Sequence, residues 1–170
     1  MSLNKNLFEN IINITSRAAI ACYPHLGKKN KILADKSATD VMRENLNQLD
    51  INGEVVIGEG ELDEAPMLYI GEKIGKGFGP KIDIAVDPVE GTKFAAENLP
   101  GAISVIAVSE KGNLFKAPET YMNKIATRKI EKGLIDLDYP IEKNIKNLSK
   151  FLNKDISSIT VCVMNRPRHK

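Results

Sequence analysis

An apolar strand pattern runs directly into an acidic, proline-containing turn near the middle of the chain. Residues 82–86 alternate, so that Ile82, Ile84 and Val86 face one way while Asp83 and Asp87 face the other. Asp87 therefore lies at the carboxyl end of the predicted strand, where layered folds place functional groups. We expect Asp83 to form a salt bridge at the start of the strand.

The turn spans residues 87–92 and reads Asp-Pro-Val-Glu-Gly-Thr. Pro88 cannot continue a paired strand, so we expect it to end the strand and to bring Glu90 back toward Asp87. The final Gly-Thr can open a helix or turn whose free amides point at an anion. Carboxylates beside such amides suit a hard divalent cation that is shared with a phosphate, Mg²⁺ or Mn²⁺. The alternative is a solvated acidic loop.

A second acidic cluster follows an earlier strand pattern at residues 54–57. Residues 58–64 read Gly-Glu-Gly-Glu-Leu-Asp-Glu and carry four carboxylates. On composition alone, a solvated acidic loop is the more common explanation for such a run.

Composition narrows the class of protein. Length, 170 residues, suits one domain or slightly more. Lys+Arg number 24 against 22 Asp+Glu, and the resulting net charge of +2 predicts neither nucleic acid nor an anionic membrane as a partner. We see no membrane-spanning run and no signal peptide. Cys22 and Cys162 lie in apolar segments and are predicted to be buried, reduced thiols, which favours a cytoplasmic protein.

Hydrophobic periodicity predicts mixed helices and strands without strict alternation. We expect a turn at Asn52-Gly53 and a solvated basic loop at residues 28–31. The predicted fold class is α+β, or a layered α/β sandwich. Helices are expected at about 7–22, 37–49, 120–127 and 141–152, and strands at 54–57, 82–86, 102–108, 114–116 and 159–164.

Longer motifs carry a resemblance to a known family. Residues 56–73 read Val-Ile-Gly-Glu-Gly-Glu-Leu-Asp-Glu-Ala-Pro-Met-Leu-Tyr-Ile-Gly-Glu-Lys, and residues 83–92 follow. Tyr121-Met122 and then Arg166-Pro167-Arg168-His169 come in the expected order. The chain resembles the N-terminal half of class II fructose-1,6-bisphosphatases, within the lithium-sensitive, metal-dependent sugar phosphatase superfamily. The resemblance spans essentially all 170 residues.

The resemblance implies a site, position by position. Two metal ions would be bound, each by its own pair of carboxylates. Asp63 would hold or deprotonate the attacking water, and Thr92 would help to activate that water or protonate the leaving group. The implied metal ligands are Asp35 and Glu59 for one ion and Asp87 and Glu90 for the other, and the implied substrate contacts are Lys31, Glu90, Gly91, Thr92, Tyr121, Arg166, Pro167 and Arg168.

The implied activity is Mg²⁺- or Mn²⁺-dependent hydrolysis of fructose 1,6-bisphosphate to fructose 6-phosphate and phosphate, in gluconeogenesis. Alternatives are a sedoheptulose bisphosphatase, another sugar or inositol phosphatase of the superfamily, or a fragment that binds metal or a partner without turnover. The expected partner is a small sugar bisphosphate, not nucleic acid or a membrane.

The resemblance also implies a domain plan. Residues 1–156 would form the N-terminal metal-binding phosphatase domain of a sugar-phosphatase sandwich. Residues 157–170 would begin a truncated C-terminal α/β domain, with residues 159–164 as its first strand. A homo-oligomer is expected for the full-length protein.

Overall fold

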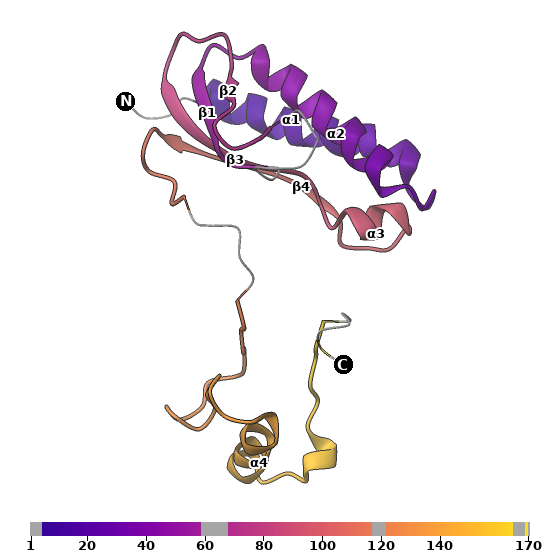
Figure 1. Ribbon diagram of the computed structural model, residues 1–170, viewed down its shortest axis with the longest axis vertical. Coiled ribbons are helices and arrows are strands. Elements are labelled where there is room, and N and C mark those ends of the chain that lie inside the picture. The colour runs from indigo at the N-terminus through magenta and orange to yellow at the C-terminus, as the bar shows by residue number, and fades with distance from the viewer. Residues whose placement is uncertain (1–4, 59–67, 117–121, 165–168, 170) are drawn as a thin grey trace. The chain divides into compact units, whose positions relative to one another are not determined.

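The computed structural model describes residues 5–58, 68–116, 122–164 and 169. The chain divides into two units, residues 1–119 and 120–170. The first unit contains helices α1 (Lys5–Cys22), α2 (Lys31–Asn47) and α3 (Thr92–Ala96), the turn η1 (Tyr23–His25), and strands β1 (Asn52–Ile57), β2 (Lys73–Ile74), β3 (Lys81–Glu90) and β4 (Ile103–Glu110) (Figure 1). The second contains α4 (Ile141–Leu152) and η2 (Ile156–Ser158).

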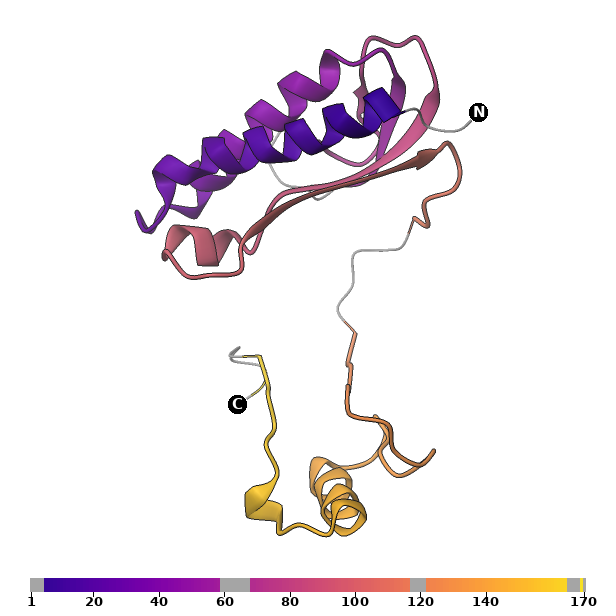
Figure 2. The same ribbon diagram turned by 180° about the vertical axis from the view of Figure 1, so that it is seen from behind.

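The first unit is a mixed sheet with two long helices on one face. The strand order is β2-β1-β3-β4, with β1 parallel to β3 and the other pairs antiparallel. Helices α1 and α2 cover the same face of the sheet, as both views show (Figure 2). The predicted α+β class is therefore confirmed. Since β1 and β3 are parallel, the segments that follow them leave from one edge of the sheet.

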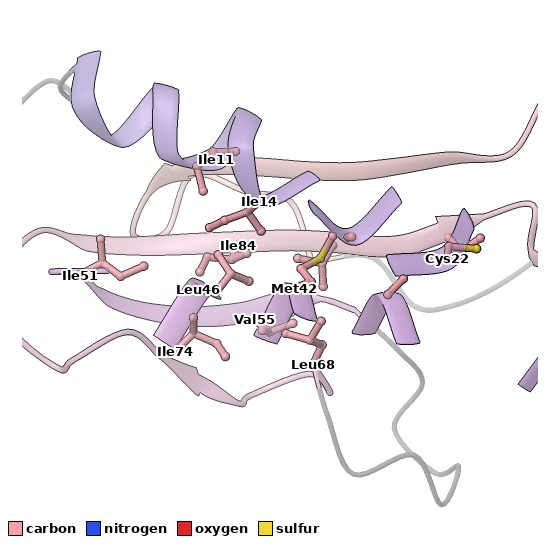
Figure 3. Close-up of a cluster of buried hydrophobic side chains, with 14 of the residues drawn as sticks. Ile11, Ile14, Cys22, Met42, Leu46, Ile51, Val55, Leu68, Ile74 and Ile84 are labelled. Carbon is pink, nitrogen blue, oxygen red and sulfur yellow. The ribbon is translucent and has the colours of Figure 1, made fainter. Parts of the chain in front are cut away.

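The core lies between this sheet and the two helices. Met42 and Leu46 of α2 are fully buried against Val55, Leu68 and Ile84 (Figure 3). Along β3 the predicted alternation holds for the three apolar side chains that face the helices. The buried core comprises Leu7, Ile11, Ile14, Ala18, Cys22, Ala34, Ala38, Met42, Leu46, Ile51, Val55, Leu68, Ile74, Ile82, Ile84, Val86, Val89 and Ala95.

Helix α2 begins six residues earlier than predicted, at Lys31 rather than at residue 37. The side chain of Asn30 caps it by accepting a hydrogen bond from the Leu33 amide at 3.0 Å. The expected basic loop therefore ends at this cap. Asp35 consequently lies inside a helix, whose position relative to the sheet is set by packing.

Pro88 does not end strand β3, contrary to the prediction. The strand continues to Glu90, which pairs with Ile103 of β4, and the register shifts between Asp87 and Glu90. The shift accommodates the proline, which has no amide hydrogen to donate to the ladder. Pro88 is fully buried.

Three smaller predictions about the first unit are wrong. Asn52-Gly53 opens β1 instead of forming a turn. Asp83 is buried, and its carboxylate accepts a hydrogen bond at 2.6 Å from the Gly112 amide, with no ion pair to it among the described residues. Residues 114–116 are not a strand.

In the second unit, only the helix at 141–152 is confirmed, as α4. Residues 122–127 are not helical, and residues 159–164 form no strand. Cys162 is exposed, whereas Cys22 is buried as predicted. A short apolar run needs a partner strand or a packing surface to become regular, and the described residues of this unit supply neither. No helix in the described part of the chain is long and apolar enough to cross a membrane.

Candidate functional site

Asp87 and Glu90 form the centre of the candidate site, at the carboxyl end of β3. The two residues flank the register shift at Pro88, and their carboxyl groups lie close enough for Glu90 to raise the pKa of Asp87. Asp87 Oδ1 also accepts a hydrogen bond from the Val89 amide at 3.1 Å, which fixes its side-chain direction. The sequence prediction that Glu90 returns toward Asp87 is therefore confirmed, although the backbone stays in the strand.

The electrostatics of Asp87 reflect this crowding. Burial raises the pKa of Asp87 to about 6, and the hydrogen bond with Glu90 and the negative charge of Glu90 act in the same direction. The charge of Asp35 adds to the rise, which places Asp35 of α2 near Asp87 of β3. Three of the predicted ligand carboxylates are thus brought into one neighbourhood from two elements far apart in the sequence.

Asp35 is half-buried, and burial raises the pKa of its carboxyl group as well. Cys22, at the end of α1, lies near it: burial and then the charge of Asp35 raise the pKa of the Cys22 thiol. The neighbouring Lys36 is paired with Asp40, one turn further along α2, at 2.9 Å. Nothing in the sequence indicated that Cys22 and Asp35 are neighbours, because this depends on how α1 packs on α2.

Gly91 and Thr92 connect β3 to the short helix α3. Gly91 precedes the helix with a φ of 82°, a left-handed conformation that glycine adopts without strain. The Thr92 hydroxyl donates a hydrogen bond at 3.0 Å to the carbonyl of Val89, which precedes Glu90 in the chain. The hydroxyl is therefore held next to the segment that carries Asp87 and Glu90. This hydroxyl is held in place before any ligand binds.

Lys31, the first residue of α2, is exposed. It lines an open hollow of about 420 Å³ together with Lys29, Ala96, Glu97 and Leu99. Two of these lining residues are bonded to each other, since the Lys29 amide donates to the Ala96 carbonyl at 2.8 Å. The structure therefore places the predicted substrate lysine between the start of α2 and the end of α3.

The remaining predicted site residues lie outside the described residues: Glu59, Asp63, Tyr121, Arg166, Pro167 and Arg168. The two residues before Glu59 are described, and they show where the chain leaves the sheet. Ile57, at the end of β1, pairs with Ala85, two residues before Asp87. Gly58, which precedes Glu59, therefore leaves the sheet at the edge where Asp87 lies.

The donor chemistry at this edge fits a divalent cation. Within residues 5–58, 68–116, 122–164 and 169, no three histidine, cysteine or carboxylate side chains are grouped closely enough to hold a metal by themselves. However, Asp35, Asp87 and Glu90 have no ion-pair partner in that part of the chain, whereas Asp40, Asp50, Glu54, Glu72 and Glu97 each have one. Oxygen donors with uncompensated negative charge suit Mg²⁺ or Mn²⁺.

Comparison with known proteins agrees with this chemistry. The sequence pattern of the family described as bacterial fructose-1,6-bisphosphatase, glpX-encoded, matches residues 5–170. The chain belongs to this family. Membership of the glpX-encoded fructose-1,6-bisphosphatase family confirms the resemblance that the motifs at residues 56–73 and 83–92 indicated.

Named relatives of the glpX-encoded family are similar over nearly the whole chain. A fructose-1,6-bisphosphatase 1 class 2 from Escherichia coli K12 is 48% identical over 92% of this chain and 46% of its own length. One from Haemophilus influenzae is 44% identical over 98% of this chain and 50% of its own. A "D-fructose 1,6-bisphosphatase class 2/sedoheptulose 1,7-bisphosphatase" from Prochlorococcus marinus MIT 9312 is 45% identical over 99% and 50%.

The chain thus spans about half the length of the curated relatives it matches. Among solved structures, an extragenic suppressor from Pyrococcus furiosus is similar at 21% identity with a TM-score of 0.43, over 63% of this chain and 41% of that one. That likeness is too low to carry an argument.

Proposed function

We propose that this chain supplies the metal-binding half of a phosphoric monoester hydrolase that removes the 1-phosphate of fructose 1,6-bisphosphate. The observation that carries this is that Asp87 and Glu90 lie at the edge where β1 and β3 both end, with Asp35 close enough for its charge to raise the pKa of Asp87. Ligands of layered α/β folds bind at the carboxyl ends of such strands. Glu59, one residue after Gly58, is proposed to complete the ligand set.

Two divalent ions, Mg²⁺ or Mn²⁺, are proposed for these carboxylates: Asp35 and Glu59 would hold one, and Asp87 and Glu90 the other. When bound, such ions lower the pKa of a water molecule and stabilise negative charge on the phosphate and leaving oxygens. Because the pKa of Asp87 is raised to about 6, any proton on this carboxyl group must leave before it can coordinate a metal.

Other residues of the chain would carry out proton transfer and bind the substrate. The Thr92 hydroxyl, held by the Val89 carbonyl, is proposed to pass a proton at the scissile phosphate. Asp63 is proposed to orient or deprotonate the attacking water. Lys31 is proposed to attract a substrate phosphate. Tyr121, Arg166, Pro167 and Arg168 are proposed to bind the sugar bisphosphate, with the arginines as phosphate forks.

The main alternative substrate is sedoheptulose 1,7-bisphosphate, which appears in the name of the Prochlorococcus relative. Another sugar or inositol phosphate is a weaker alternative, because residues 56–73 follow the class II pattern. A chain that binds metal or a partner without turnover is the alternative outside the enzymes.

We further propose that the active form is larger than this chain. Residues 1–156 would be the N-terminal domain, and residues 157–170 would lead into a C-terminal α/β domain that completes a sugar-phosphatase sandwich and supplies further metal and substrate contacts. A cytoplasmic homo-oligomer acting in gluconeogenesis and glycerol metabolism is the proposed setting. The share of the relatives that this chain covers supports this proposal.

The test is a phosphate-release assay. The protein to use is this chain extended by whatever coding sequence follows Lys170 in its gene, here called the extended protein. It would be assayed on fructose 1,6-, sedoheptulose 1,7- and inositol phosphates with Mg²⁺, Mn²⁺ or chelator. We expect metal-dependent release from fructose 1,6-bisphosphate first. No release from any of the panel would refute an enzymatic role.

A pair of variants tests the assignment of carboxylates. Asp87→Asn removes a ligand charge with little change of shape, so activity should fall by orders of magnitude, about 10²-fold or more, while the fold persists. Glu61→Gln carries no ligand assignment and should lose much less. Equal losses would show that the acidic residues have been assigned to the wrong roles.

A further inference from the structure

A buried carboxylate outside the site links helix α2 to the turn before β2. Glu72 is only 4% exposed. One of its oxygens accepts a hydrogen bond from Arg43 Nε of α2 at 2.5 Å, and the other accepts the backbone amide of Leu68. A buried carboxylate is stable only when it is paired and hydrogen-bonded, and this one satisfies both conditions.

Leu68 is held in an unfavourable backbone conformation. Its φ is 58°, although it is not a glycine, and its side chain is fully buried in the core beside Val55 (Figure 3). For a branched side chain this conformation persists only where the surroundings determine it from several sides. Here the Glu72 carboxylate holds the amide while the core holds the side chain.

The same turn is bonded to the end of β1. The Gly71 amide donates to the Val55 carbonyl at 2.7 Å, and the Val55 amide donates to the Glu72 carbonyl at 2.9 Å. Gly58 lies so close to Leu68 that a Cβ at this position would clash with the Leu68 carbonyl oxygen. Gly58 and Leu68, which flank residues 59–67, are therefore fixed against each other.

We propose that Glu72 and Arg43 are positioning residues for the metal site. The proposal rests on the proposed function, in which Glu59 is a metal ligand. Arg43 fixes Glu72, Glu72 fixes the strained Leu68, and Leu68 in turn sets the place of Gly58, which is bonded to Glu59. Neither Glu72 nor Arg43 contacts metal or substrate. They act by preorganising the chain on both sides of the acidic cluster.

Three variants of the extended protein test this. Arg43→Met removes the charge but keeps an apolar stem on a residue whose side chain is 40% exposed. It leaves the buried Glu72 carboxylate without its cation, so its melting temperature should fall. Glu72→Gln keeps an oxygen for the Leu68 amide and loses the charge that Arg43 binds. Arg43→Lys restores a charge without the guanidinium geometry. The matched control is Glu54→Gln. It removes the charge of a carboxylate on β1 that forms ion pairs with Lys73 and Lys111 and not with Arg43.

The readouts are Mn²⁺ affinity by calorimetry, hydrogen exchange of the Leu68 and Gly71 amides without metal, and melting temperature. We expect Arg43→Met and Glu72→Gln to weaken Mn²⁺ binding about tenfold, as loss of ligand-orienting contacts typically does, with faster exchange at both amides. Arg43→Lys should recover part of the affinity. Glu54→Gln should change neither the Mn²⁺ affinity nor the exchange rates of the two amides.

Three results would overturn the proposal. If the variants lower the melting temperature but keep wild-type Mn²⁺ affinity, Glu72 and Arg43 serve stability alone. If affinity falls without faster exchange at Leu68 and Gly71, the effect does not pass through this turn. If the unaltered protein binds no Mn²⁺, the proposed function fails and this proposal falls with it.

Discussion

At the scale of the residue, Asp87 shows how the fold changes the chemistry of a common side chain. Its pKa is raised to about 6 by burial first and by Glu90 second. A free aspartate has a pKa of about 3.9, so the folded protein binds this proton more tightly than the unfolded chain does. The resulting stabilisation is complete below about pH 4 and is lost as pH rises through about 6.

We therefore predict a pH-dependent melting temperature in the absence of metal. In chelator, the extended protein should become less stable between about pH 4 and pH 6.5, and Asp87→Asn should reduce this loss because residue 87 no longer ionises. Mn²⁺ should restore the stability of the unaltered protein at pH 7. Thermal melts across pH check this, with the exposed Asp50→Asn as control. A variant that loses stability as steeply as the unaltered protein would contradict it.

The hydroxyl of Thr92 is the group proposed to transfer a proton. Its hydroxyl donates to the Val89 carbonyl, which a serine can also do. Thr92→Ser should retain substantial activity, whereas Thr92→Ala should lose about 10²–10⁴-fold in kcat with little change in KM, the range typical of proton-transfer groups. Steady-state kinetics decide the question. A rise in KM alone would make Thr92 a binding or capping residue.

At the scale of the element, the β3–α3 connection depends on one left-handed residue. Gly91 has a φ of 82°, and a Cβ on it would lie 3.1 Å from the Phe94 ring. Any other residue at this position is strained by about 1–2 kcal/mol and shifts the backbone between Glu90 and Thr92. The geometry of the metal and proton-transfer groups therefore depends on this glycine.

Gly91→Ala is predicted to lower both stability and activity. A matched control exists in Gly112→Ala, because Gly112 has a φ of 88° and nothing within 4 Å of the added Cβ. Both variants should lose a similar amount of melting temperature, but only Gly91→Ala should lose more than tenfold in activity. Equal activities would show that the connection tolerates the displacement.

At the scale of the whole molecule, both units leave apolar surface uncovered. On the sheet face opposite α1 and α2, Ile57, Ile103 and Val105 are 43%, 57% and 38% exposed. In the described part of the second unit only Asn144 is buried, where it bonds the Asp136 backbone and so holds the preceding loop on α4. Apolar surfaces of this kind mark places where further protein packs.

We predict that the 170 residues alone are not a working phosphatase. The isolated chain should self-associate, bind Mn²⁺ weakly and release little phosphate from fructose 1,6-bisphosphate, because the site lacks the enclosure that makes its electrostatics effective. Supplying the downstream half, fused or as a separate chain, should restore activity. Sedimentation, calorimetry and phosphate release test this. A monomeric 170-residue product with full metal-dependent turnover would contradict the prediction.

The sequence alone predicted the elements whose signal is local, and the family. Helix α4 was expected at residues 141–152 and lies there, because its apolar residues repeat with the helical period. The apolar alternation of β3 was likewise predictable, and the motifs at 56–73 and 83–92 indicated the family that the comparison shows. The resemblance that these motifs carry also implied Asp35, Asp87 and Glu90 as metal ligands, and the charges of Asp35 and Glu90 both act on Asp87 in the structure.

Tertiary structure decided what depends on residues distant in sequence. Strand β2 has two residues, too few for a periodic pattern, and forms only because β1 is there to pair with it. Residues 159–164 have the apolar pattern of a strand, but they pair with no strand in the described part of the chain and stay irregular. Pro88 remains in β3 because β4 shifts register to accommodate it. The Arg43–Glu72 pair joins residues 29 positions apart. Pairing and burial are long-range interactions, whereas hydrophobic period is a property of neighbours, so the sequence pattern predicts elements and packing decides their contacts.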